Sequence, residues 1–270
     1  QFATGLVGVR TPWPVPRNAL DPQIVPGGSS SGSAVAVARG LVAFSLGTDT
    51  AGSGRVPAAL NNIVGLKPSL GALSTMGVVP ACRTLDAVSV FAQTVTDAHT
   101  VFRAACAFDA SDPYARPVPV PPIPALPPSL RIDIPSPDTI RFFGDDIQEA
   151  AFDAVCTRLR ETATLTELDF APFFAAAEML YAGAWVAERH AVVGPVMYST
   201  PEAVLPVIRQ IVGQAEGKSA TDAFRAAADA MKAARLKPFA ADKAATAARD
   251  RVETLARDQA RREARAQALD

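Results

Sequence analysis

The 270-residue chain is poor in histidine and cysteine and has no excess of charge. Its two histidines, His99 and His190, lie outside any glycine-rich or polar stretch typical of a catalytic triad. Its three cysteines show no Cys-x-x-Cys spacing, which predicts reduced thiols, no metal site and a cytoplasmic protein. With 26 basic and 27 acidic side chains, it carries almost no net charge, which does not favour binding to nucleic acid or an anionic membrane. No run of about 18 apolar residues predicts a membrane span.

Two clusters of glycine and hydroxyl-bearing residues stand out instead, at 26–33 and 47–55. The segment between them, Ala34–Leu46, is rich in small and branched apolar residues, which predicts a buried helix followed by a short buried strand. A flexible Gly/Ser linker would not carry such buried elements. The expected order is therefore loop, helix, strand, loop.

The second cluster suits nucleophilic catalysis by Ser53. Glycine-rich loops can aim several backbone N–H groups at one point, where a developing oxyanion would be stabilised. The Gly-x-Ser-x-Gly elbow is absent, because Ala51 and Arg55 stand where the motif requires glycine. The Ser-x-x-Lys motif is also absent, because no lysine has a serine three residues before it. A proton relay through a second serine is the remaining simple arrangement.

The paired loops resemble those of the amidase signature family, which uses a Ser–cis-Ser–Lys triad. The resemblance implies that Ser53 is the nucleophile and that Ser29, 24 residues earlier, is the cis-serine. It also implies an oxyanion hole made by the backbone N–H groups of Thr50, Ala51, Gly52 and Ser53. The fold expected is the α/β amidase signature fold, of which this chain is a part: a mixed sheet core covered by helices on both faces. No metal or cofactor is expected.

Charged residues flank the nucleophile loop. Asp49 and Arg55 are expected to hold its shape rather than to transfer protons, and Asp86 to support it. Lys67 is one candidate for the general base, but it matches a structural Gly-Leu-Lys-Pro element of the family. The catalytic lysine is instead expected upstream of Gln1, in a longer protein.

A second informative stretch contains Tyr181, Trp185 and Arg189, spaced so that they would share one face of a helix. From spacing alone, an aromatic core stripe with a surface arginine is the simpler interpretation. Within the family, however, this stretch is similar to the allophanate hydrolases. The resemblance implies that Tyr181 and Arg189 bind the carboxylate of allophanate, and Ala184 replaces the proline expected there.

The chain divides into four predicted segments. Residues 1–116 form the core with the nucleophile, 117–129 a proline-rich connector, 130–237 the remainder with the substrate-binding helix, and 238–270 a charged Ala/Arg-rich helical tail. The family resemblance is expected to end near residue 225. Strands are predicted at 63–67, 88–95, 130–134 and 164–170, with helices from Asp97 to Cys106 and from 145–146 onward.

The resemblance implies hydrolysis of allophanate to ammonia and carbon dioxide through an acyl-enzyme, as a step of urea degradation. A urea carboxylase is the implied partner, and a homodimer is a further expectation. Three alternatives stay open. The chain is another amidase of the family or the A-type chain of an amidotransferase, a catalytically inactive fragment that only binds, or a scaffold built on the proline-rich segment.

Overall fold

The computed structural model describes residues 3–123, 127, 129–181, 183, 185–219 and 221–222. Two units divide the chain, Gln1–Lys218 and Ser219–Asp270, and the fold below is that of the first. The predicted tail at 238–270 lies outside the described residues, as does Ala184. Within the described part of the chain, no helix has the length and apolar character needed to cross a membrane.

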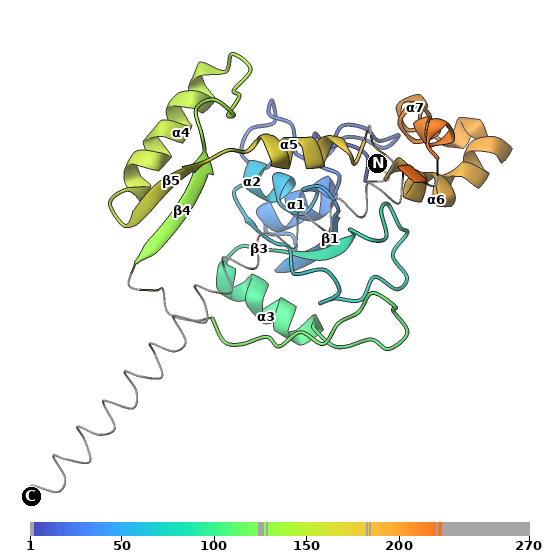
Figure 1. The fold of residues 1–270 in the computed structure, drawn as a ribbon. Coiled ribbons are helices and arrows are strands. Elements are labelled where there is room, and N and C mark those ends of the chain that lie inside the picture. The colour runs from blue at the N-terminus through green and yellow to red at the C-terminus, as the bar shows by residue number, and fades with distance from the viewer. Residues whose placement is uncertain are drawn as a thin grey trace, which may run out of the picture. The chain divides into compact units, whose positions relative to one another are not determined.

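The core is a three-stranded antiparallel sheet with the order β1-β3-β2 (Figure 1). β3 (Ala87–Ala92) lies in the middle, between β1 (Phe44–Asp49) and β2 (Val64–Leu66). The register pairs Asp49 with Ala87, so the start of β3 lies beside the end of β1 that leads into the glycine-rich loop. All three strands were expected from the sequence, with boundaries within a few residues.

Helices cover both faces of this sheet, as the fold prediction requires (Figure 1). Phe91 points to the face covered by α1 (Ser31–Ala38) and α2 (Val56–Leu60), where it packs with small side chains of both helices. Val90 and Ala92 point to the opposite face, against α3 (Val95–Ala105). This alternation follows from the two-residue period of a strand.

A second, two-stranded sheet is parallel and is built from one strand–helix–strand unit. β4 (Leu130–Pro135) pairs in register with β5 (Ala163–Leu168), and α4 (Asp146–Leu159) connects them. The Asp145 side chain accepts a hydrogen bond from the Gln148 amide at 2.9 Å, which caps the helix where the sequence predicted its start.

Further helical elements follow in the described residues up to 217. They are α5 (Ala171–Glu178), α6 (Val186–Ser199), the 3₁₀ helix η1 (Pro201–Ala203), α7 (Pro206–Gly213) and the 3₁₀ helix η2 (Gln214–Gly217). The predicted helix spanning Tyr181 to Arg189 is therefore wrong, because α5 ends at Glu178 and α6 begins only at Val186.

Two further expectations need correction. The helix before Cys106 begins at Val95 with Thr94 as its N-cap, which accepts from the Asp97 amide at 3.1 Å. Asp97 therefore lies in the first turn. β1 is also not a buried strand, since about half of Phe44 and Leu46 is exposed. Among the described residues β1 pairs only with β3, and a strand at the edge of a sheet has less cover.

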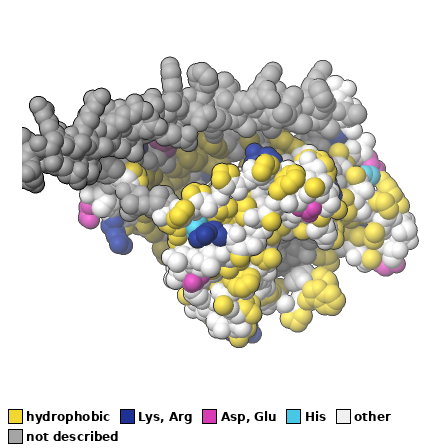
Figure 2. All heavy atoms as spheres, turned by 90° about the horizontal axis from the view of Figure 1, so that it is seen from below, with side chains coloured by type: hydrophobic (Ala, Val, Ile, Leu, Met, Phe, Trp, Pro, Cys, Tyr) yellow, Lys and Arg dark blue, Asp and Glu magenta, His cyan; other side chains and the backbone are white. Residues whose placement is uncertain are grey.

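Hydrophobic side chains are visible on the face seen in Figure 2, among few charged ones.

The proline-rich segment has no helix or strand over residues 117–123. It lies against α3, where the Pro121 carbonyl is 3.0 Å from His99 Nε2 and the Val118 carbonyl accepts from the Cys106 thiol at 3.8 Å.

Buried asparagines fix the segment that leads into the first glycine-rich loop. The Asn61 amide group donates to the carbonyls of Pro26 and Pro57, both at 2.8 Å, and its side-chain oxygen accepts from the Ala19 amide at 2.9 Å. Asn18 donates to the Leu60 carbonyl at 2.8 Å. The end of α2 is thereby bonded to the residues just before Gly27 and Gly28.

We expect Asn61→Ala to lower the free energy of unfolding by about 2–4 kcal/mol, because it leaves buried backbone groups without partners. Urea unfolding followed by circular dichroism measures this change. The exposed Gln23, changed to alanine, is the matched control and should alter stability by less than about 0.5 kcal/mol. A loss of the same small size for Asn61→Ala would contradict the anchoring role.

Candidate active site

The two glycine-rich loops are held side by side by Ser30. Its hydroxyl accepts a hydrogen bond from the Thr48 amide at 3.2 Å and donates to the Thr48 carbonyl at 3.3 Å. Ser29 directly precedes Ser30 and is half-buried, and the peptide bond between Gly28 and Ser29 is cis. Ser53 lies in the other loop and is 2% exposed. The two serines expected to act in catalysis therefore lie on adjacent loops.

Asp49, at the end of β1, binds the nucleophile loop from inside. Its carboxylate accepts from the amides of Gly52 at 2.8 Å and Gly54 at 3.2 Å. Arg55 donates to both carboxylate oxygens, from Nε at 2.8 Å and from Nη2 at 3.0 Å. Burial alone would raise the pKa of Asp49, but the hydrogen bond and charge of Arg55, together with the two amides, lower it below its ordinary value.

The contacts of Asp49 with Gly52, Gly54 and Arg55 form a clamp, which changes the expected oxyanion hole. The Gly52 amide donates to Asp49, so in this conformation it is not directed at a substrate. The prediction of four N–H donors therefore loses Gly52 and leaves Thr50, Ala51 and Ser53 as candidates. The physical reason is that a buried carboxylate requires several donors, and the nearest amides of its own loop supply them.

The loop also rests directly on the central strand. A Cβ at Gly54 would lie 2.5 Å from the Ser89 hydroxyl oxygen, so only glycine allows this approach. The Ser89 hydroxyl is buried and has no hydrogen-bond partner within the described residues. No sequence pattern points to Ser89, because a lone serine in an apolar strand carries no signal of its own.

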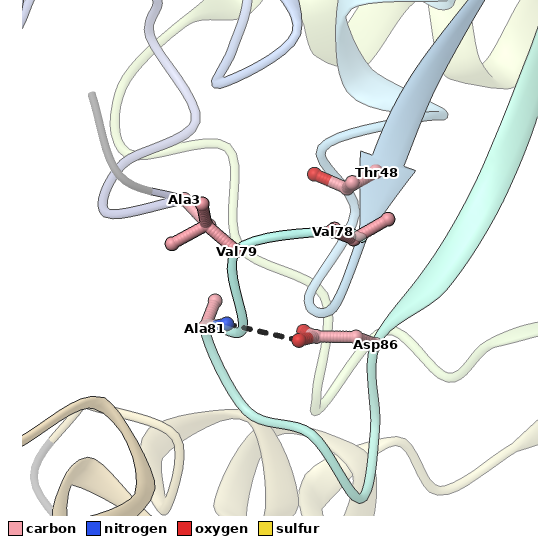
Figure 3. A pocket seen from close by; sticks show the side chains of 6 residues that line it. All are labelled: Ala3, Thr48, Val78, Val79, Ala81 and Asp86. Carbon is pink, nitrogen blue, oxygen red and sulfur yellow. Dashed lines mark hydrogen bonds between the residues drawn. The ribbon is translucent and has the colours of Figure 1, made fainter. Parts of the chain in front are cut away.

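Asp86 supports the loop from the opposite side. Its carboxylate accepts from the Thr50 hydroxyl and from the amides of Ala81, at 2.9 Å, and Cys82, at 3.1 Å. Figure 3 shows the Ala81 amide directed at this carboxylate. Asp86 also lines a pocket of about 250 Å³, whose other lining residues are Ala3, Thr48, Val78, Val79 and Ala81. The pocket thus adjoins the end of β1 at Thr48, and Asp86 joins it to Thr50 of the nucleophile loop.

Arg189 of α6 is completely buried, with 0% of its surface exposed. Its Nη1 donates to the Leu180 carbonyl at 2.8 Å and its Nη2 to the Ala3 carbonyl at 3.4 Å, whereas Nε has no partner among the described residues. The guanidinium carbon lies 5.2 Å from the centre of the Tyr181 ring, and the buried Tyr181 hydroxyl also lacks a partner in the part of the chain that the structure describes. The two residues therefore meet, although no single helix carries both.

None of the acidic side chains that the structure describes pairs with Arg189, because the ion pairs among these residues are Asp49–Arg55 and His190–Glu216. An unpaired buried guanidinium is costly unless an anion joins it. One of its backbone acceptors, Ala3, lines the pocket beside the nucleophile loop. The arrangement suits a small carboxylate at one end of the pocket.

Lys67 follows β2 and lies near the same loop, since its charge interacts with Asp49 and Arg55. Burial lowers its pKa. Its ammonium group donates to the Pro68 carbonyl at 3.0 Å, a contact that fits the structural role implied by the Gly-Leu-Lys-Pro resemblance.

The clamp on Asp49 predicts a pH-dependent stability. We expect Asp49→Asn to lower the free energy of unfolding by about 1–3 kcal/mol at neutral pH. Because the pKa of Asp49 is lowered in the folded state, its contribution is complete above its unfolded value of 3.8 and is lost as pH falls below it. Urea unfolding from pH 7 down to about pH 3 should therefore show wild type and variant converging below about pH 3.8. Asp133→Asn, at an exposed position, is the control, and a constant difference at all pH values would contradict the clamp.

Comparison with known proteins relates this geometry to its relatives. The urea amidolyase of Saccharomyces cerevisiae is 45% identical over 228 residues, which cover 83% of this chain and 12% of that protein. The A-type chain of the glutamyl-tRNA(Gln) amidotransferase from Streptococcus pneumoniae is 47% identical over 118 residues, which cover 44% of this chain and 24% of that one. The chain thus spans about an eighth of the yeast relative's length.

Solved structures of similar fold belong to the same kinds of protein as these relatives. A serine-to-alanine variant of Kluyveromyces lactis allophanate hydrolase superposes with a TM-score of 0.78 at 43% identity, covering 85% of this chain and 38% of that one. A structure described as an amidase gives a TM-score of 0.71 at 29% identity, covering 88% of this chain and 51% of that one. The family model described as Amidase matches residues 1–266, past residue 225 where the resemblance was expected to end. The chain therefore belongs to the amidase family, as its two glycine-rich loops indicate.

Proposed function

We propose that this chain hydrolyses allophanate, a urea that carries a carboxylate on one nitrogen. The observation that carries the proposal is the buried Arg189, which has no acidic partner among the described residues and lies beside the Tyr181 hydroxyl. The unsatisfied Arg189 Nε and Tyr181 hydroxyl are hydrogen-bond donors suited to a carboxylate. The substrate would therefore bind by its carboxylate at this end of the pocket.

The other end of the substrate would present its terminal amide to Ser53. Ser29 passes the Ser53 proton to a lysine, the role that the family resemblance assigns. Ser53 attacks the amide carbon, and the amides of Thr50, Ala51 and Ser53 stabilise the oxyanion. Ammonia leaves, water releases the acyl group from Ser53, and the remaining carboxylated fragment gives ammonia and carbon dioxide.

The names of similar proteins support this substrate, because they include urea amidolyase and allophanate hydrolase. The same names support a place in urea degradation. A carboxylase that makes allophanate from urea is then the proposed partner, as a separate protein or as part of a longer chain.

The second candidate is a general amidase or an amidotransferase component. The 47% identity to the pneumococcal amidotransferase chain favours it, although that match covers only 44% of this chain. Such an enzyme does not need a carboxylate at the position of Arg189. The preference for carboxylated over neutral amides therefore separates the two functions.

We expect Ser53→Ala to lower kcat for allophanate at least about 10³-fold, because no other group forms the acyl-enzyme. Ammonia release is measured with an active preparation, either this 270-residue chain or a longer protein that contains it. Ser69→Ala removes an exposed hydroxyl and is the matched control. If Ser53→Ala kept more than about a tenth of wild-type activity, Ser53 would not be the nucleophile.

We expect Tyr181→Phe to lower kcat/KM for allophanate about 10- to 100-fold, since it removes one hydrogen bond to a charged group. For a neutral amide such as malonamide, the same change should alter kcat/KM less than about threefold. Tyr114→Phe, at an exposed tyrosine that does not line this pocket, should affect neither substrate. Equal losses with both substrates would favour the general amidase.

A further inference from the structure

Helix α6 connects two neighbouring charged residues to different parts of the molecule. Arg189 points into the interior, where it contacts Leu180 and Ala3. Glu188, one position earlier, instead contacts Thr84 in the loop at residues 81–86. The two residues are 104 positions apart in the sequence. The proposed carboxylate-binding arginine and this loop are therefore joined through adjacent residues of one helix.

The contact between Glu188 and Thr84 uses both carboxylate oxygens. Oε2 accepts from the Thr84 amide at 3.1 Å, and Oε1 accepts from the Thr84 hydroxyl at 2.6 Å. An ionised carboxylate offers an acceptor oxygen to each donor, which a glutamine cannot do. The pair is partly exposed to solvent, so we expect it to fix geometry more than to add stability.

Hydrogen bonds within the loop at residues 81–86 connect Thr84 to Asp86. The amides of Leu85 and Asp86 both donate to the Cys82 carbonyl at 2.8 Å, and Asp86 accepts from the amides of Ala81 and Cys82. Asp86 also accepts the hydroxyl of Thr50. A movement of Thr84 would therefore be transmitted to Thr50 of the nucleophile loop through Asp86.

Cys82 lies between the two carboxylates of this connection. Burial, together with the nearby charges of Glu188 and Asp86, raises the pKa of its thiol to about 12. Its thiol is therefore neutral at physiological pH and completely buried. A neutral thiol suits a buried position near two acidic side chains.

We infer that Glu188 is a positioning residue, which holds Arg189 at a fixed distance from the nucleophile loop at residues 50–53. The inference rests on the proposed function, because it requires a substrate that contacts both ends of the pocket. Such a substrate gains affinity from both contacts at once only if the two ends are held in place before binding. A ligand that contacts one end does not depend on Glu188.

The test measures binding, so that it does not depend on turnover. Isothermal titration of the Ser53→Ala protein compares malonamate, which has an amide and a carboxylate, with malonamide, which has two neutral amides. We expect malonamate to bind at least about tenfold more tightly. Adding Glu188→Gln should reduce this advantage to less than about threefold, while malonamide affinity changes less than about twofold.

A second pair of variants makes the same test from the other side of the contact. Thr84→Val removes the hydroxyl donor and should reduce the advantage as Glu188→Gln does. Thr84→Ser keeps both donors and should preserve it. The double variant of Glu188→Gln and Thr84→Val should show no greater loss than either single change, because both break one contact. Glu178→Gln, at an exposed position of α5, is the matched control.

The outcomes separate the two hypotheses. If the Ser53→Ala protein shows no preference for malonamate, the proposed carboxylate site fails, and with it the proposed function. If the preference exists but survives both Glu188→Gln and Thr84→Val, only the positioning role is overturned. Equal weakening of both ligands also overturns it, because that result indicates a general structural defect. Should Glu188→Gln fail to fold, the comparison of Thr84→Val with Thr84→Ser decides.

Discussion

A buried carboxylate at the end of β1 is the constraint on which the rest of the site depends. Asp49 must find donors once it is buried, and it takes them from the loop that directly follows it, at Gly52, Gly54 and Arg55. The nucleophile loop is therefore folded around its own strand. The register of β1 with β3 then sets where Ser53 lies, because Ser89 of β3 contacts Gly54.

Three separate groups of contacts extend this constraint outward. Asn61 fixes the segment before Ser29, Ser30 joins the two loops, and Asp86 holds Thr50 from the loop at residues 81–86. Asn61 and Ser30 bind backbone groups of a distant segment, and Asp86 accepts from the hydroxyl of Thr50. A loop rich in glycine has no regular backbone pairing of its own, so such contacts supply the rigidity that catalysis requires.

Arg189 presents the opposite electrostatic problem. Asp49 is buried together with its cation, whereas the contacts of Arg189 with other described residues are to backbone carbonyls and an aromatic ring. A protein gains no stability from a buried charge in that state. A ligand with a negative charge would stabilise the buried Arg189. Arg189 bonds Ala3, which lines the pocket beside the nucleophile loop, so such a ligand would lie near Ser53.

The sequence by itself determined the order of loop, helix, strand and loop around the two serines, the three strands of the core, the strand–helix–strand unit and the family. These follow from local patterns, namely the period of apolar residues and the clustering of glycine with hydroxyl groups. It did not determine how Tyr181 and Arg189 meet, because the helix predicted from their spacing does not exist. Nor did it indicate that Asp49 occupies the Gly52 amide, or that Glu188 contacts Thr84. Only the tertiary structure decided these contacts, because single polar residues carry no periodic signal and their partners are chosen by proximity after folding.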